Sequence, residues 1–187
     1  AARWMGPGCQ YGDIAYQKKA WQVSIRFPYT GPTKAVDGDT SSCSETNQWW
    51  RVDLEAVYRI TGLEIYTNKA EGLKGFEVRV GNISSNSSAE FPGICFNHNV
   101  NDNISEVTHV LCTSELVGKH LMIWIPGQDT IMQLCDVRVY GGRSVAYRRD
   151  ASQPNVHDKG EASLAVDGGT NTRYHGWSCS QTEADKS

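Results

Sequence analysis

The sequence contains neither a long apolar run nor a cluster of basic residues. Its longest candidate for a membrane segment, Leu121–Ile125, is far shorter than the ~20 apolar residues that a membrane-spanning helix needs. The 18 Lys and Arg are outnumbered by 21 Asp and Glu, which gives the 187-residue chain a formal net charge of -3. A general electrostatic attraction to nucleic acid or anionic lipid is therefore not expected. We predict no nucleic-acid partner and no membrane insertion.

The motifs of common catalytic sites are also missing. There is no Gly-x-Ser-x-Gly elbow, no His-Glu-x-x-His helix, no phosphate-binding loop and no pair of carboxylates placed on opposing strands. His98, His109, His120 and His157 have no spacing that indicates a metal site or a catalytic pair. We therefore expect that the protein is not an enzyme.

No stretch of about 12 or more residues shows an apolar helical stripe flanked by caps. Instead, several short segments alternate apolar with polar residues, as half-buried strands do. These segments are Gly62–Tyr66, Gly75–Gly81, Glu106–Leu111, Leu121–Ile125 and Leu134–Tyr140. Short strands joined by turns predict an all-β fold, an antiparallel β-sandwich or jelly roll.

Cysteines and glycosylation sequons indicate the redox environment. The chain has six cysteines, and sequons begin at Asn82, Asn86 and Asn103. Free buried cysteines and chance sequons are the alternative, but the even cysteine count and the clustered sequons favour a secretory, oxidising route. We expect a secreted, extracellular glycoprotein with disulfide bonds, although the sequence shows no signal peptide.

The stretch Ala35–Leu54 gathers unusual chemistry in few residues. Asp37-Gly38-Asp39 is a turn signal whose carboxylates and carbonyls can converge on a hard cation. Cys43 follows, and then Trp49 and Trp50 begin an alternating strand as large apolar anchors. A simple Asx turn at Asp37 is the alternative to a metal site.

The chain contains an internal repeat. Val145–Arg149 resembles Ile14–Lys18, and Leu164–Gly168 resembles Lys34–Gly38, at offsets of 131 and 130 residues. We therefore expect an N-terminal arm over 1–12, a complete domain over 13–142 and a partial second repeat over 143–187. The second copy ends before any counterpart of the two tryptophans. A flexible tail, an arm packed on the first module and a truncated protein stay open as alternatives.

Four motifs in succession resemble the F-type lectin (fucolectin) family, a branch of the discoidin-like jelly rolls. They are Ala35-Val36-Asp37-Gly38, Trp49-Trp50-Arg51-Val52-Asp53-Leu54, Gly75–Gly81 and Cys135–Tyr140. The likeness covers roughly residues 13–142 and restarts in the tail. It implies an antiparallel jelly roll, a structural Ca²⁺ and, in sugar-binding members, a shallow fucose site between loops at one end.

The resemblance also implies ligands and disulfides residue by residue. Its calcium set corresponds here to the carbonyls of Lys34 and Asp39, the Asp37 carboxylate, Ser42, the Cys135 carbonyl and Asp136. Its disulfides correspond to Cys43–Cys135 and Cys95–Cys112. Cys9 and Cys179 are left over, and a bond between them or a bond to another chain are both open.

The sugar site departs from the family pattern. Fucose-binding members use one His and two Arg, whereas this first module has no matching His and only Lys69 and Lys74 near the Arg positions. The tail segment Tyr174–Cys179 resembles the fucose-His segment through His175, with Trp177 as a candidate for stacking on a sugar. Ordinary packing is the alternative role for these two tail residues.

These observations predict a secreted, calcium-binding, lectin-like module that binds glycans or glycoproteins, with fucose as the expected sugar, in adhesion or innate recognition. A second function stays open because the sugar residues differ. It is a structural or protein-binding adhesion module that keeps the jelly roll and assembles, with its own copies or other proteins, through residues 143–187.

Overall fold

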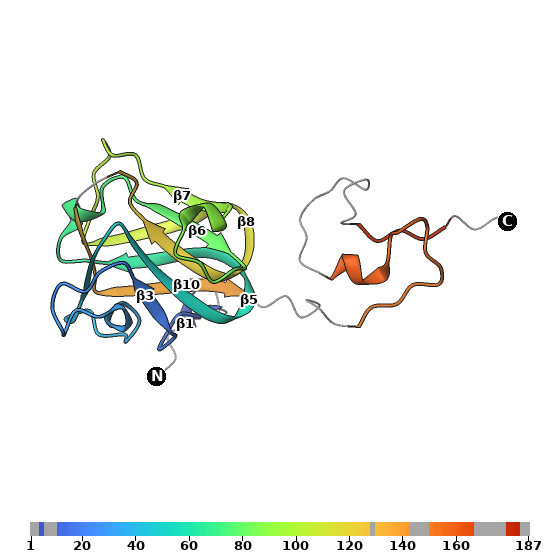
Figure 1. Cartoon of the computed structure of the whole chain (residues 1–187), viewed down its shortest axis with the longest axis horizontal. Helices are drawn as coiled ribbons and strands as arrows, with labels where there is room; N and C mark the ends of the chain where they lie inside the picture. Colours follow the sequence, from blue (N-terminus) through green and yellow to red (C-terminus); the bar gives the residue numbers. More distant parts are fainter. Residues whose placement is uncertain (1–3, 6–10, 128–129, 143–149, 167–178, 184–187) are drawn as a thin grey trace. The chain divides into compact units, whose positions relative to one another are not determined.

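The computed structural model describes residues 4–5, 11–127, 130–142, 150–166 and 179–183, and the chain divides into two units, Ala1–Gly142 and Arg143–Ser187 (Figure 1). The strands of the first unit are β1 Trp4–Met5, β2 Tyr11–Gly12, β3 Ala20–Gln22, β4 Ser44–Asn47, β5 Trp49–Tyr66, β6 Glu77–Gly81, β7 Gly93–Asn97, β8 Val107–Trp124, β9 Ile131–Leu134 and β10 Asp136–Gly142. Short 3-10 helices are η1 Pro32–Ala35, η2 Ala70–Leu73 and η3 Ser88–Glu90, with η4 Ala162–Ala165 in the second unit. The first unit is therefore the antiparallel all-β fold that the strand pattern predicts.

The main sheet has the order β10-β5-β8-β6-β7, and β3 pairs with a further part of β5. A second, two-stranded sheet consists of β4 and β9, which pair so that Glu45 lies opposite Gln133. All of these pairings are antiparallel. The two sheets bring chain segments that are distant in sequence to one end of the domain.

Strands β5 and β8 are longer than the sequence suggested. Each runs for 18 residues, and their pairing shifts register between Asp53 and Tyr58 and between Ile60 and Gly62. Glu55 adopts a φ of 64° at the first shift. Irregularities of this kind let a strand bend and continue, so residues that break the strict alternation still belong to one strand.

The core lies against one face of the main sheet. Two rows cross it in register, Trp50 with Ile123 and Val78, and Val52 with Leu121 and Val80. All six side chains are buried, and Trp50 is fully covered. Its indole Nε1 donates a hydrogen bond of 2.9 Å to the carbonyl of Pro32, which fixes η1 over the core.

Two disulfides join distant parts of the first unit, Cys43 to Cys135 and Cys95 to Cys112. These are the two pairings that the family resemblance implies. The second one attaches β7 to β8. Since β7 pairs with β6 and Phe91 is fully buried, the segment that carries the sequons also contributes a strand and a core side chain.

Asp13 ties the start of the domain to β10. Its Oδ1 accepts hydrogen bonds of 3.0 Å from the backbone N–H groups of Ala15 and Val139. Burial raises the pKa of the Asp13 carboxyl from 3.8 to about 6, against the two hydrogen bonds, which favour the ionised form. The ionised form of Asp13 therefore destabilises the folded protein relative to the protonated form.

We predict that Asp13→Asn gains stability relative to the wild type as the pH rises. In the wild type, the protonated Asp13 carboxyl contributes its full stability below about pH 3.8. This contribution is lost as the pH rises through about 6, where the carboxyl ionises in the folded state. Asn can still accept both hydrogen bonds but carries no charge. The gain should reach at most about 3 kcal/mol near pH 8, measured by urea unfolding at pH 4 and pH 8. A difference between the variants that does not change with pH would contradict the prediction.

Candidate functional site

One glutamine shapes the loop between β3 and η1. The Gln22 side chain at the end of β3 donates hydrogen bonds from Nε2 to the carbonyls of Ser24, Thr30 and Glu45, at 2.5, 3.1 and 2.9 Å. Three acceptors from the start of the loop, its end and β4 thus converge on one amide group. The Thr30 hydroxyl closes the loop further, because it accepts from the N–H of Phe27 and donates to the carbonyl of the same residue.

This loop presents apolar side chains outward. Val23, Ile25, Phe27 and Tyr29 are all exposed, and Tyr29 is 70% exposed. The rings of Phe27 and Tyr29 stack with centroids 5.5 Å apart and planes within 3°, and the Arg26 guanidinium lies 5.4 Å from the Phe27 centroid. Exposed stacked aromatic rings are a surface on which a partly apolar ligand can pack.

A cavity of about 450 Å³ opens beside this aromatic pair. Its walls come from the loop, from η1, from the turn before β4, from strands β4 and β9 and from the segment that follows β5. Its lining residues are Phe27, Tyr29, Thr30, Lys34, Ser41, Ser42, Cys43, Glu45, Asn68 and Gln133. Apolar rings on one side and hydrogen-bonding groups on the other are the usual lining of a small-molecule site.

Glu45 is the polar centre of the cavity. Although the residue is only 6% exposed, its Oε1 accepts hydrogen bonds from Lys69 Nζ at 2.9 Å and Gln133 Nε2 at 3.0 Å. The hydrogen bond from Lys69 holds the pKa of the Glu45 carboxyl below its usual value. Oε2 has no hydrogen-bond partner, and Arg26 Nη1 lies 4.0 Å from it. Glu45 is therefore an ionised carboxylate with one oxygen that has no donor, and that oxygen is itself covered in this structure.

The predicted sugar residues have mixed positions. Lys69 does not line this cavity itself but forms an ion pair with Glu45, which does, whereas Lys74 pairs with Glu71 at 2.8 Å, beside η2. His175 and Trp177 lie outside the described residues. The sequence did not point to Glu45, Gln133 or the aromatic pair. The exposed alternation of apolar residues between Val23 and Tyr29, beside prolines and glycine, is the one signal that could have indicated the loop.

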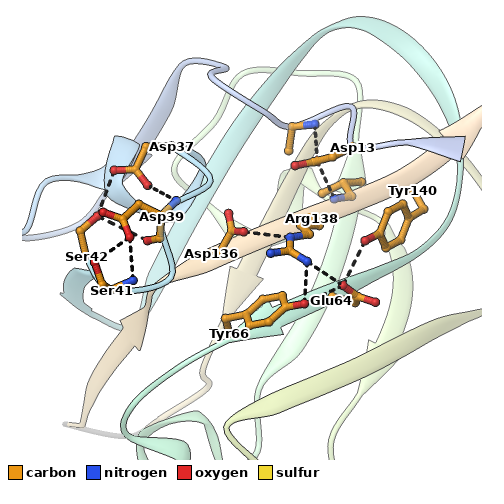
Figure 2. Close-up of polar contacts among 12 residues, drawn as sticks. Asp13, Asp37, Asp39, Ser41, Ser42, Glu64, Tyr66, Asp136, Arg138 and Tyr140 are labelled. Carbon is orange, nitrogen blue, oxygen red and sulfur yellow. Dashed lines mark hydrogen bonds and ion pairs between the residues drawn. The ribbon is translucent and has the colours of Figure 1, made fainter. Parts of the chain in front are cut away.

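The predicted calcium residues form a second cluster (Figure 2). Asp37 Oδ2 accepts a hydrogen bond from Ser42 Oγ at 3.0 Å, and Asp37 Oδ1 accepts from the N–H of Asp39 at 2.9 Å. Asp39 Oδ1 accepts from the hydroxyl and N–H of Ser41, which lowers the pKa of the Asp39 carboxyl. The Lys34 ammonium lies 3.2 Å from Asp37 Oδ2, so this carboxylate already attracts a cation.

Asp136 belongs to a neighbouring polar network on the sheet. It is 1% exposed, and its Oδ2 accepts from Arg138 Nε at 2.9 Å. Arg138 also donates to the hydroxyl of Tyr66 at 2.6 Å, and Glu64 accepts from the hydroxyl of Tyr140 at 3.0 Å. Figure 2 shows the Asp136 carboxylate directed toward Arg138. Burial raises the pKa of the Tyr140 hydroxyl, which keeps it a hydrogen-bond donor.

The Cys43–Cys135 disulfide connects the two halves of the predicted calcium set. Cys43 follows Ser42 in the acidic turn, and Cys135 precedes Asp136 at the start of β10. Within the described ranges, no three Asp, Glu, His or Cys side chains gather as a metal site. A cation here would therefore depend on carbonyl oxygens in addition to Asp37 and Asp136.

The remaining predicted residues are placed as follows. Asn82, Asn86 and Asn103 are all exposed, and Asn86 Oδ1 accepts a hydrogen bond from Arg51 Nε at 3.2 Å. Cys179 is half-buried in the second unit, and Cys9 lies outside the described residues, so their pairing stays a prediction. In the described part of the chain, no helix is long and apolar enough to cross a membrane.

Comparison with known proteins gives the family. A family model described as a NedA-like, galactose-binding domain matches residues 34–110. Fucolectin-3 of Anguilla japonica is 31% identical over 144 residues, which are 68% of this chain and 78% of that protein. The chain belongs to the F-type lectin (fucolectin) family. Its first unit is accordingly an antiparallel jelly roll of the discoidin-like type, as the sequence motifs predict.

Solved structures agree with this membership. The F-type lectin from the serum of striped bass, Morone saxatilis, has a TM-score of 0.62 and 25% identity, and the match covers 93% of this chain and 65% of that one. The lectin-binding domain of lectinolysin in complex with Lewis b has a TM-score of 0.57 at 21% identity, covering 75% of this chain and all of that one. That second likeness shows the fold alone.

Fucolectin-1 of Anguilla japonica is 30% identical over 122 residues, and this F-type lectin spans 66% of its length. The named relatives are lectins rather than enzymes, which agrees with the expectation of a non-enzymatic binding module. The cavity at Glu45 is therefore the candidate binding site of a lectin fold.

We predict that Lys69→Met destabilises the domain by about 1–2 kcal/mol at pH 7, because it removes the charged donor of a buried carboxylate. A lowered pKa for Glu45 means that its contribution is present above its ordinary pKa of 4.5 and is lost as the pH falls, so the cost should shrink in acid. Urea unfolding measures it.

Lys74→Met is the matched control, since its partner Glu71 is 82% exposed and such surface pairs contribute about 0–1 kcal/mol. Equal losses for the two lysine variants would show that Glu45 does not depend on Lys69.

Proposed function

We propose that this F-type lectin is a carbohydrate-recognition module that binds a glycan in the cavity beside Glu45. The observation that carries the proposal is a cavity in which an ionised carboxylate with one unsatisfied oxygen lies next to a stacked aromatic pair. A sugar hydroxyl would donate to Glu45 Oε2 after a small shift of the side chains that cover this oxygen, while an apolar face of the same ring packs on Phe27 or Tyr29.

The charges around Glu45 favour an uncharged sugar. An acidic sugar would bring its own negative charge toward Glu45 Oε2, and an amino sugar would bring a positive charge toward Lys69 and Arg26, which flank the same carboxylate. A hydroxyl avoids both repulsions because it donates to the carboxylate and can accept from a lysine. Fucosylated glycans are the first ligands to test, since the relatives include fucolectins and a lectin domain in complex with Lewis b.

We predict that a glycan array shows binding of neutral, fucose-containing glycans, and that Glu45→Gln and Tyr29→Ala each weaken it by about tenfold or more. The amide introduced at position 45 should turn its oxygen toward Lys69 and Gln133, because both are donors. Its NH₂ group then takes the place of Oε2, so the acceptor proposed for the ligand is lost. Tyr29→Ala removes a stacking surface. Surface plasmon resonance with the best array ligand measures both effects.

Leu111→Ala is the control for this experiment, because Leu111 is a large, 79% exposed apolar side chain that does not line the cavity. If the folded protein binds no glycan, the lectin proposal fails. A protein-binding or structural adhesion module, assembled through residues 143–187, would then be the better description.

We further propose that Ca²⁺ binds at the Cys43–Cys135 disulfide, held by the carbonyls of Lys34, Asp39 and Cys135 together with the side chains of Asp37, Ser42 and Asp136. Two observations support the fit. All donors are oxygens, as Ca²⁺ requires, and the Lys34 ammonium beside Asp37 shows that a positive charge is favourable there. The bound ion would add a cross-link between the acidic turn and β10, and would displace the Lys34 ammonium.

We predict that Ca²⁺ raises the Tm of the wild type and that Asp37→Asn weakens calcium binding by about tenfold or more, because the only carboxylate of the turn proposed as a side-chain ligand is lost. Isothermal titration calorimetry and thermal unfolding with and without EDTA measure the two effects. Asp102→Asn, in an exposed loop, should behave like the wild type. Absence of both calcium heat and a calcium-dependent Tm would refute the site.

The setting that we propose is extracellular. The two disulfides in the first unit fit an oxidising compartment, and the exposure of all three sequon asparagines leaves each accessible for glycan attachment. Binding of cell-surface or soluble glycoproteins in adhesion or innate recognition is the corresponding role.

A further inference from the structure

The second unit repeats the glutamine-centred hydrogen bonds of the first. Gln153 donates from Nε2 to the carbonyls of Asn155, Gly160 and Gln181, at 2.7, 2.9 and 3.1 Å. Gln22 makes the same three contacts in the first unit. In each unit the acceptors are the residue two positions later, the residue two positions before the 3-10 helix, and a residue two positions after a cysteine.

Backbone hydrogen bonds follow the same correspondence. The N–H of Thr30 donates to the carbonyl of Phe27, and the N–H of Gly160 donates to that of His157. The N–H of Glu45 donates to the carbonyl of Thr30, as the N–H of Gln181 does to that of Gly160.

One side-chain bond and one helix complete the match. Asn47 N–H donates to the Ser24 hydroxyl, and Glu183 N–H donates to the Asn155 side-chain oxygen. The four-residue helices η1 and η4 follow the two loops at the same place. So many equivalent contacts identify one loop scaffold present twice.

The side chains on the two scaffolds are different. Phe27 corresponds to His157 and Tyr29 to Lys159, and all four are exposed. Glu45, the carboxylate of the first cavity, corresponds to Gln181. Residues 154–159 therefore have no aromatic pair, and a neutral glutamine stands at the position of Glu45, although the hydrogen-bonded frame is intact. The tips also differ in backbone, since Asp158 has a φ of 54°, which proline cannot adopt at position 28.

We propose that Gln22 and Gln153 are equivalent positioning residues, and that the loop from 154 to 159 is a second recognition loop with its own specificity. It would take a polar saccharide surface through hydrogen bonds and charge, where the first loop takes an apolar sugar face by stacking. This inference rests on the proposed function for the ligand class, whereas the equivalence of the two scaffolds does not depend on it.

Hydrogen exchange with mass spectrometry on the full chain tests the scaffold without a ligand. Gln22→Met should speed the exchange of the Thr30 and Glu45 amides by about tenfold or more, and Gln153→Met should do the same at Gly160 and Gln181. Each variant should leave the other unit protected, so each is the matched control of the other. Unchanged exchange at Gly160 and Gln181 in Gln153→Met would overturn the equivalence.

Glycan binding tests the recognition part. Gln22→Met should weaken glycan binding by about tenfold while the global Tm changes little, whereas Gln153→Met should leave binding by the first unit as it is. The loop exchange Phe27→His with Tyr29→Lys should keep the protection of Thr30 and Glu45 and shift array binding from fucose-containing to more polar glycans. Loss of protection at Thr30 and Glu45, or an unchanged glycan profile, would contradict the proposal that the side chains of the two loops can be exchanged on one frame. If the wild type binds no glycan, the proposed function fails. The hydrogen-exchange data still show whether Gln22 and Gln153 are equivalent.

Discussion

The disulfide between Cys43 and Cys135 is the constraint on which both candidate sites depend. It closes a separation of 92 residues, and in a chain-entropy estimate a loop of that length is worth about 4–5 kcal/mol to the folded state. Its position matters as much as its energy. Ser42 and Glu45 lie beside one cysteine, and Gln133 and Asp136 lie beside the other. One covalent bond thereby assembles the acidic turn on one side and the wall of the cavity on the other.

Near that disulfide the fold buries a polar group, Glu45, without giving both of its oxygens a hydrogen-bond donor. Glu45 has two donors on one oxygen and none on the other. A buried acceptor without a partner costs about 1–3 kcal/mol, and a ligand hydroxyl that fills the position recovers part of that energy. Lys69 and Gln133 keep the carboxylate ionised and fixed in one orientation. We therefore interpret the unsatisfied oxygen as part of the proposed binding site.

The sequence predicted the parts of this structure that depend on local patterns or on neighbouring residues. The alternation in Gly75–Gly81 predicted a strand that the structure confirms as β6. The resemblance to the family implied both disulfides, which the structure also contains. The continuity of β5 could not be predicted, because Glu55 to Thr61 mix polar and apolar residues without strict alternation and the strand continues only through shifts of register. The cavity could not be predicted either, since Glu45 and Gln133 meet only through the pairing of β4 with β9, and Tyr29 reaches them through the loop that Gln22 holds.

In the repeated loop, one set of residues holds the backbone and another set is exposed to solvent. Gln22 and Gln153 bind backbone carbonyls, so the frame that they hold is insensitive to the side chains between them. Phe27 and Tyr29 point to solvent, where a change to His157 and Lys159 leaves every one of the repeated hydrogen bonds in place. Such a loop can change its ligand without a change of fold. In our proposal the exposed residues at each tip are the ones that decide which sugar surface the loop contacts.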